Sequence, residues 1–307
     1  MAQPELLRRF WQSKSAVVGA VLMTGIVFVV IFASLIAPQN PYDLRQIYLE
    51  DSLQPPFWQK TLKQAGTTED AEQGTTGVVR RFILGSDEDG RDVFSAILYG
   101  MRISLFVGVS ATFLSALFGV FLGLTAGYYR GHLDTVIMRL ADVQLSFPSI
   151  LIAILLMAIW GSGLLQIIVA VVVVRWVVYA RIIRGSMLAE REKEYVLAAS
   201  ALGASSPAII FRHILPNIIS PIIVISAVEI ASVIMLESTL SYLGLGVPPT
   251  KPSLGMLIKF GYDVLLSGHW WISVFPGIAL VTIVFAINLL GDWLRDTLNP
   301  NLGQVVQ

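Results

Sequence analysis

Residues 194–217 read EYVLAASALGASSPAIIFRHILPN, and they interrupt a chain that is otherwise apolar enough to lie in lipid. The stretch mixes alanines with a glycine, two prolines and several charged side chains. About 20 consecutive apolar residues are needed for one helix to cross a bilayer, and long apolar runs flank the stretch on both sides. We therefore expect it to lie outside the lipid and to join two membrane spans.

The composition is that of a membrane protein. Of the 307 residues, 55% are hydrophobic and only 14% are charged, whereas soluble domains have roughly a quarter charged residues. The 21 basic residues equal the 21 acidic ones, so no overall charge indicates a nucleic-acid partner. The chain has no cysteine, which excludes disulfides, thiolate metal sites and cysteine nucleophiles.

Six stretches are candidate membrane spans, and they predict an all-α integral membrane protein. The third is short of a full crossing, so we expect its helix to begin upstream near Asp134, with Arg139 and Asp142 at the inner interface. The six stretches are Ala16–Ala37, Ile103–Tyr129, Leu145–Trp160, Leu164–Ala180, Ile218–Leu236 and Ile272–Leu290.

Basic residues predict the orientation, because positive charge in short loops stays cytoplasmic. The loops after the second and fourth spans carry Arg130, Arg181, Arg184, Arg191, Lys193 and Arg212. Both termini are therefore expected in the cytoplasm. The first span resembles a signal peptide, but its apolar run is too long for a secretory one, which favours an uncleaved anchor.

This topology divides the chain into four parts. Residues 1–37 are the N-terminus with the first span, 38–100 an external loop, 101–294 the remaining spans, and 295–307 a cytoplasmic tail. Within the external loop, 87–100 (DEDGRDVFSAILYG) has apolar residues at helical spacing, which predicts a short helix on the outer membrane surface.

The interrupting stretch itself predicts two helices. The first runs from Glu190 to Leu202 and ends at Gly203, a residue type that closes helices without steric cost. Ser205 or Ser206 is a candidate cap for the second, which has Pro207 at its first position and ends near Ile214. Such a pair either packs on its own bundle or fills a groove in another protein.

The pattern Ala198-Ala199, Gly203 and Leu215-Pro216 resembles the EAA loop of bacterial ABC importer permeases. In that family the loop docks on the ATPase subunit. The resemblance implies a coupling loop over residues 184–216, and it departs from the family pattern at Leu197 and His213. The nearest acidic replacement for Leu197 is Glu194. The candidate coupling residues are Glu194, Ala198, Ala199, Gly203, Ala204, Arg212, Leu215 and Pro216.

Three further segments resemble the oligopeptide/dipeptide branch: Leu84–Leu105, Glu237–Gly246 and Phe275–Asn299. The chain is similar to the second, C-type permease of that system, which implies a type I ABC importer permease fold in the bacterial inner membrane. The implied partners are a homologous permease, two ATPases and a substrate-binding protein. The implied cargo is a di- or oligopeptide, a nickel chelate or glutathione. Candidate contacts with the binding protein are Asp87, Gly90, Arg91 and Asp92.

The chain lacks the chemistry of an ATPase. No lysine follows a glycine, so the phosphate-binding GK[ST] motif is absent. We therefore expect ATP and Mg²⁺ to be bound by partner subunits, with no cofactor, metal or catalytic residue in this chain. Two alternatives stay open: a secondary transporter or channel that works alone, and a membrane scaffold subunit without a pathway.

Ionisable residues inside spans are candidates for function because burying them is costly. Glu229 either meets a substrate ammonium in the translocation pathway or forms a buried pair with another helix. Glu237 is a second pathway candidate, although hydrogen bonds that order the outer loop suit its position better. Arg175 is expected to extend toward the cytoplasmic interface.

Gly119, Gly123 and Gly127 follow the four-residue spacing of close helix contacts in membranes. The stripe fits two partners equally well, namely the second permease or another helix of this chain.

Overall fold

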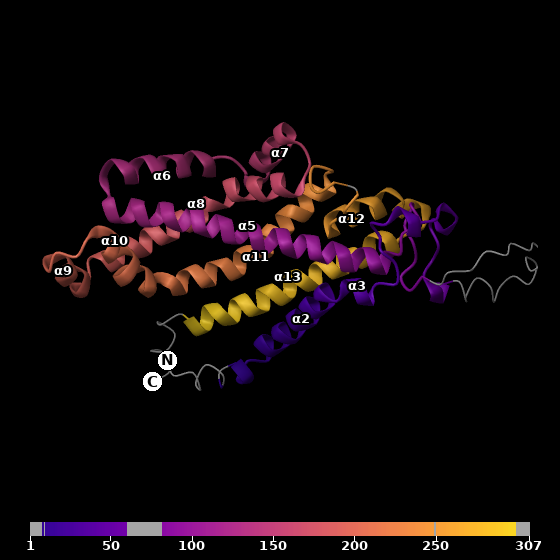
Figure 1. Cartoon of the computed structure of the whole chain (residues 1–307), viewed down its shortest axis with the longest axis horizontal. Helices are drawn as coiled ribbons and strands as arrows, with labels where there is room; N and C mark the ends of the chain where they lie inside the picture. Colours follow the sequence, from indigo (N-terminus) through magenta and orange to yellow (C-terminus); the bar gives the residue numbers. More distant parts are fainter. Residues whose placement is uncertain (1–7, 9, 60–81, 249, 299–307) are drawn as a thin grey trace, which may run out of the picture.

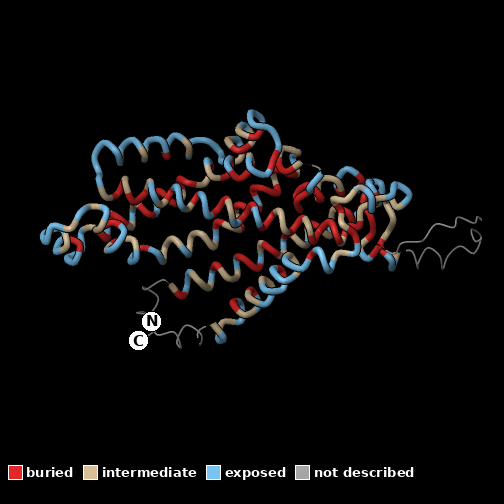
Figure 2. Tube along the Cα trace, in the orientation of Figure 1, coloured by how far each residue is buried: buried red, intermediate tan, exposed pale blue. Residues whose placement is uncertain are grey.

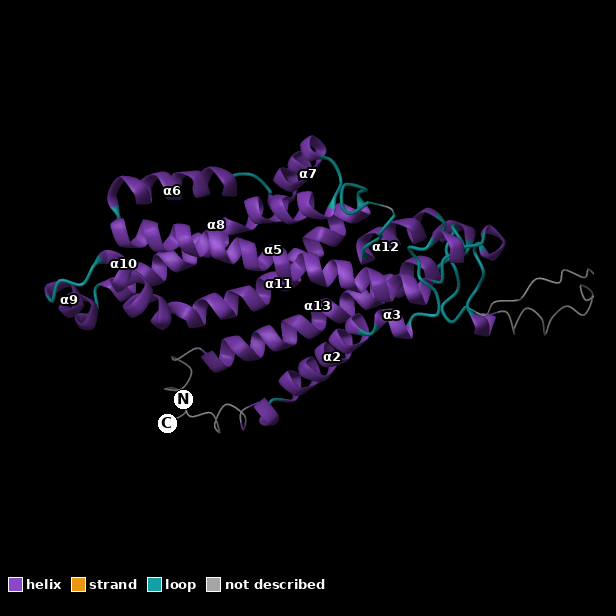
Figure 3. Cartoon of the chain, viewed as in Figure 1, coloured by secondary structure: helices purple, strands orange, loops and turns teal. Residues whose placement is uncertain are grey.

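The computed structural model describes residues 8, 10–59, 82–248 and 250–298. Within these ranges every regular element is a helix (Figure 3). This confirms the all-α fold. The elements are α2 (Lys14–Ile31), α3 (Ala33–Ile36), α5 (Val93–Tyr129), α6 (Gly131–Leu145), α7 (Ser149–Trp160), α8 (Leu164–Arg191), α9 (Glu194–Ala201), α10 (Ser206–Ala208), α11 (Ile219–Tyr242), α12 (Leu254–Asp263) and α13 (Trp271–Leu298), with short 3₁₀ or π turns between them.

Five helices (α2, α5, α8, α13 and the α10–α11 run Ser206–Tyr242) are long and apolar enough to cross a membrane. The helices α6 and α7 form a sixth candidate, broken by a bend of 90°. The start of α2 and the end of α13 lie at the same end of the bundle as α9 and α10 (Figure 1). An even number of crossings is needed to bring both there, so α6 and α7 together make one span.

The bend in this third span follows from its sequence. Proline disfavours helical backbone in the residue before it, and the break precedes Pro148. Two ion pairs hold the first half, α6, against α8: Asp134 to Arg184 at 2.5 Å and Asp142 to Arg181 at 2.5 Å. The helix thus begins upstream of Asp134, as predicted, but it does not continue straight into the apolar segment.

The glycine stripe on α5 packs against α8 of the same chain. A Cβ added to Gly123 would lie 2.7 Å from the Ala180 carbonyl oxygen, and one on Gly127 would lie 2.7 Å from the Met187 Cβ. Real Cβ contacts are never this short, so the absence of side chains is what lets the two helices touch. Of the two predicted partners, the structure shows the helix within this subunit.

The prediction of a separate surface helix within residues 87–100 is wrong. Its apolar residues form the first turns of α5, which is a single helix of 37 residues. At 1.5 Å per residue it is about 55 Å long, well beyond the ~30 Å hydrocarbon core. One end therefore projects past the lipid. Of the expected external loop (38–100), residues 60–81 lie outside the described residues.

Exposed positions run along the outer faces of the bundle (Figure 2). Many of them are large apolar side chains, including Phe113, Phe121, Leu155 and Val281. A soluble monomer rarely exposes so much contiguous apolar surface. Such a surface is stable in contact with lipid or with another membrane subunit.

Candidate functional site

The segment that joins α8 to α11, residues 192–218 and here called the elbow, protrudes from one end of the bundle (Figure 1). Its inner side is anchored by apolar packing. Val196, Ile209 and Ile214 are buried in one cluster with Ile183 and Met187 of α8. Movement of the elbow is therefore mechanically linked to α8.

Gly203 terminates α9 in the way that its sequence position predicts. Its φ is +82°, a left-handed conformation that glycine adopts without cost. The Gly203 N–H donates to Ser200 O at 3.0 Å and the Ala204 N–H to Ala199 O at 3.1 Å. These two bonds are the Schellman pattern, which satisfies the last carbonyls of the helix.

Tyr195 holds the base of the elbow together. Its hydroxyl donates to the Glu190 carboxylate at 2.6 Å and accepts from Asn217 Nδ2 at 3.0 Å. Lys193 Nζ lies 2.7 Å from the other Glu190 oxygen. Partial burial and the Glu190 carboxylate raise the pKa of Tyr195, so the phenol stays protonated at neutral pH.

The outer side of the elbow carries exposed apolar side chains. Leu202 is 89% exposed, Leu197 58% and Phe211 57%. A Cβ added to Gly203 would meet nothing within 4 Å. The elbow therefore combines a fixed base with an uncovered apolar tip. Of the other candidate coupling residues, the exposed ones are Glu194, Ala198, Arg212 and Pro216, and the half-buried ones are Ala199, Ala204 and Leu215.

Two details of the predicted helix pair are wrong. The first helix is interrupted near Lys193, so α9 begins only at Glu194. The second is not a separate helix: α10 continues through a π turn (Ile209–Ile214) and a 3₁₀ turn (Leu215–Ile218) into α11. Ser205 takes the N-cap position, but its side chain makes no capping bond. The elbow is consequently continuous with α11.

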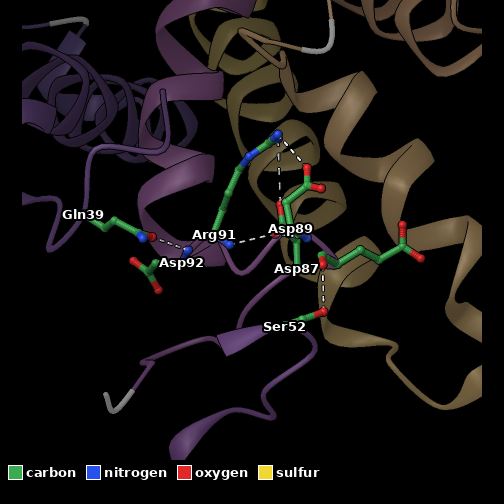
Figure 4. Close-up of polar contacts among 7 residues, drawn as sticks. Gln39, Ser52, Asp87, Asp89, Arg91 and Asp92 are labelled. Atoms are coloured by element: carbon green, nitrogen blue, oxygen red, sulfur yellow. Dashed lines mark hydrogen bonds and ion pairs between the residues drawn. The ribbon is translucent and has the colours of Figure 1, made fainter. Parts of the chain in front are cut away.

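The turn over residues 85–92, at the opposite end of the bundle (Figure 1), is held by a network of polar contacts (Figure 4). Asp87 Oδ1 accepts the backbone N–H of Asp89 at 3.0 Å and of Arg91 at 2.8 Å. Arg91 Nη2 lies 2.6 Å from Asp89 Oδ2. Burial raises the pKa of Asp87 to about 6, and the two backbone donors and Arg91 oppose this.

Asp92 begins α5 from the same turn. Its Oδ2 accepts the Ser95 N–H at 2.9 Å, which caps the helix, and its own N–H donates to Gln39 Oε1 at 2.7 Å. Burial raises the pKa of Asp92 as well. The polar contacts of this turn, including the hydroxyl of Ser52 on the Glu88 carbonyl at 2.7 Å, are drawn in Figure 4.

Two of the acidic residues in this turn are buried. Asp87 is 4% exposed and Asp92 is 2% exposed. Gly90 is buried with φ +82°, and an added Cβ would collide with the Tyr48 carbonyl. These candidate contact residues therefore shape the turn from inside, while Glu88 and Asp89 are the exposed acidic residues on its surface.

Glu237 of α11 is fully buried. It accepts hydrogen bonds from the hydroxyls of Ser104 at 3.0 Å and Ser241 at 2.7 Å. Ser104 in turn accepts the Leu254 N–H, at 3.4 Å, where α12 begins. The carboxylate thus ties α5, α11 and α12 together, which is the ordering contact expected from its position, and it does not face open space.

Glu229 and Arg175 face each other across α11 and α8. The Glu229 Oε2 and Arg175 Nη1 atoms are 3.6 Å apart. This is the interhelical pair foreseen for Glu229. The expectation that Arg175 extends toward the membrane interface is wrong, because the buried carboxylate attracts the guanidinium instead.

Comparison with protein families assigns residues 119–304 to the description "Binding-protein-dependent transport system inner membrane component". The chain belongs to this family. Residues 5–56 also match the N-terminal transmembrane domain of oligopeptide transport permease C. The family is one of transport permeases, so this permease is not itself catalytic.

Named relatives align over 71% to 98% of this permease. It is 36% identical to the di/tripeptide transport system permease protein DppC of Pseudomonas aeruginosa, over 98% of this chain and 94% of the relative. It is 43% identical to the glutathione transport system permease protein GsiD of Pectobacterium atrosepticum, over 71% and 72%. A solved chain of the MetNI methionine ABC transporter has a TM-score of 0.48 at 20% identity, covering 64% of this chain and 94% of that chain.

The sequence did not indicate which residues meet in two ion pairs that shape the site. The pairs of Asp134 with Arg184 and of Arg175 with Glu229 join residues 50 and 54 positions apart. The signal that could have indicated them is the presence of opposite charges in neighbouring apolar spans, where each charge needs a partner.

Proposed function

We propose that this chain is one of two permease halves of an ATP-driven importer of di- or oligopeptides. The names of its relatives support the cargo class. The observation that carries the proposal is the elbow, a segment with a fixed base and an uncovered apolar tip. Exposed leucines are costly in water, and a groove in another protein would cover them.

The elbow would couple a separate motor to the permease. It is continuous with α11 at one end and packed on α8 at the other. Nucleotide-driven closure of two ATPase subunits would shift the elbow, and both spans would follow as rigid levers. ATP and Mg²⁺ would be bound by those subunits, because this sequence lacks the lysine motif that holds phosphates.

The remaining proposed partners are a homologous permease, which completes the pathway, and an extracytoplasmic binding protein that delivers the cargo. We place the elbow and both termini in the cytoplasm of a bacterial cell and the chain in the inner membrane. Two observations support this orientation: the elbow and its neighbours carry the basic residues, and the two ends of the described chain lie at the elbow end (Figure 1).

A crosslinking experiment tests the proposal. Because the chain has no native cysteine, an introduced cysteine is the single thiol in this subunit. Leu202→Cys places a thiol on the elbow, and Leu266→Cys places one on an equally exposed leucine beside α12. We expect Leu202→Cys to capture an ATP-hydrolysing subunit in membranes, with a yield that changes on adding ATP, and Leu266→Cys to capture none.

Transport measurements decide between this proposal and its competitors. Reconstituted uptake should need both ATP and the captured subunit. Uptake driven by an ion gradient alone would indicate a secondary transporter, and no uptake in any combination would indicate a scaffold. Either of these results would contradict the proposal.

A further inference from the structure

A hollow of about 370 Å³ lies between α8, α11 and α13 in the membrane-spanning part of the molecule. Its volume is within the range of roughly 300–1,000 Å³ that is usual for small-molecule sites. Polar side chains line it from all three helices, which is uncommon in a span. They are Arg175 of α8, Ser232 and Thr239 of α11, and Asn288 of α13.

Arg175 is incompletely satisfied where it borders this hollow. Its only described charged partner is Glu229, at 3.6 Å, a distance beyond that of a good charge-assisted hydrogen bond. Among the described residues no acceptor reaches Arg175 Nε, and Glu229 Oε2 also lacks a hydrogen bond. Leaving such atoms unpaired in a low-dielectric region is costly.

A carboxylate in the hollow would remove this cost. A guanidinium presents donors in a planar fork that matches the two oxygens of a carboxylate. The side chain is 21% exposed, so part of it is open to the hollow. Ser232, Thr239 and Asn288 add hydroxyl and amide groups that can bond peptide N–H and C=O groups.

We infer that this hollow is a transit site for the C-terminal carboxylate of a short peptide, with Arg175 as its partner and Glu229 as the counter-charge that holds Arg175 between passages. The inference rests on the proposed function. It names the residues that recognise cargo inside the membrane, a step separate from capture by a binding protein. A loosely paired arginine suits transit, since it can exchange partners without losing a strong bond.

The test uses a single thiol, Thr239→Cys, in the complete transporter in native membranes. The rate of labelling by N-ethylmaleimide is measured with increasing dialanine and, separately, with dialanine amide, which has no carboxylate. We expect dialanine to slow the labelling and the amide to leave it unchanged. Adding Arg175→Gln should raise the dialanine concentration needed for protection at least about tenfold, the effect of losing one charge-assisted bond, whereas Arg175→Lys should restore part of it.

If Arg175 had a purely structural role, dialanine and dialanine amide would protect the thiol equally. Equal protection by both peptides would therefore overturn the site. A thiol that stays unlabelled without peptide would show that another chain covers the hollow, and would overturn it too. Uptake of dialanine by the wild-type complex is measured in parallel. If the wild-type complex takes up no dialanine, both the peptide assignment and the site are wrong. If it takes up dialanine but the thiol shows no carboxylate-dependent protection, only the site is wrong.

Discussion

At the scale of single residues, a substitution at Gly203 can distinguish a role in folding from a role in docking. Gly203→Leu places a side chain in a left-handed conformation, which costs roughly 1–2 kcal/mol, but in a space that is empty in this chain. We expect a modest fall in Tm and a loss of most ATP-coupled uptake, because the leucine would occupy the space needed by a docked partner.

The matched control is Gly268→Leu. Gly268 has φ +90°, and an added Cβ there also meets nothing within 4 Å, but it lies in the α12–α13 connection, away from the elbow. It should lower the Tm by a similar amount and keep uptake. Similar uptake by the two variants would show that Gly203 serves only as a helix cap.

Asp87 should make stability depend on pH. Burial raises its pKa from 3.8 to about 6 in the folded protein, so the folded state binds the proton more tightly than the unfolded chain. Ionisation therefore costs stability progressively as pH rises from about 4 through 6. Asp87→Asn keeps an oxygen acceptor without the charge.

The Tm of Asp87→Asn minus that of wild type, measured by thermal unfolding in detergent, should thus increase between pH 4 and pH 7. Burial also raises the pKa of Asp92. Asp92 is present in both proteins, so its contribution to the Tm difference cancels. A difference that stays constant with pH would mean that Asp87 is not desolvated in the folded state.

At the scale of helices, the contact between α5 and α8 depends on having no side chain at three positions. Gly123→Ala would put a Cβ 2.7 Å from the Ala180 carbonyl oxygen and 2.9 Å from the Ile183 Cβ. Overpacking of this kind typically costs about 1–3 kcal/mol. We expect a clear fall in Tm in detergent.

Gly185→Ala on α8 is the control, because its Cβ would meet nothing within 4 Å. Alanine has the higher helix propensity, so this variant should keep or slightly raise the Tm. If both substitutions behaved alike, backbone flexibility rather than close helix packing would explain the glycine stripe.

At the scale of the whole molecule, the bent third span determines which side each loop occupies. Six crossings place the elbow and the α12–α13 connection on opposite sides of the membrane. In intact cells a membrane-impermeant thiol reagent should label Leu266→Cys and spare Leu202→Cys, and permeabilisation should expose Leu202→Cys. With the N-terminus inside, five crossings would reverse this pattern. Labelling of Leu202→Cys but not of Leu266→Cys in intact cells would therefore contradict the six-span topology.

The sequence by itself determined what depends on local chemistry. Apolar length indicated five of the six spans, since a helix in lipid must satisfy its backbone internally and needs about 20 apolar residues. The third apolar stretch is too short by itself and needs α6 to complete the crossing. Gly203 predicted the end of α9, because a residue that ends a helix in the left-handed region is usually glycine. The position of the elbow between the fourth and fifth spans followed from composition alone.

Only the tertiary structure decided which distant residues meet. Glu237 gains its hydroxyl partner from Ser104, 133 positions away, and Asp87 and Asp92 are buried by loops that precede them in the chain. Arg175 was expected at the interface because a long cationic side chain in the cytoplasmic half of a span can extend to the headgroups. Its partner in the structure, Glu229, lies on another span. In an apolar bundle a charge is stabilised by whichever opposite charge packing brings near it, and packing is a property of the assembled helices.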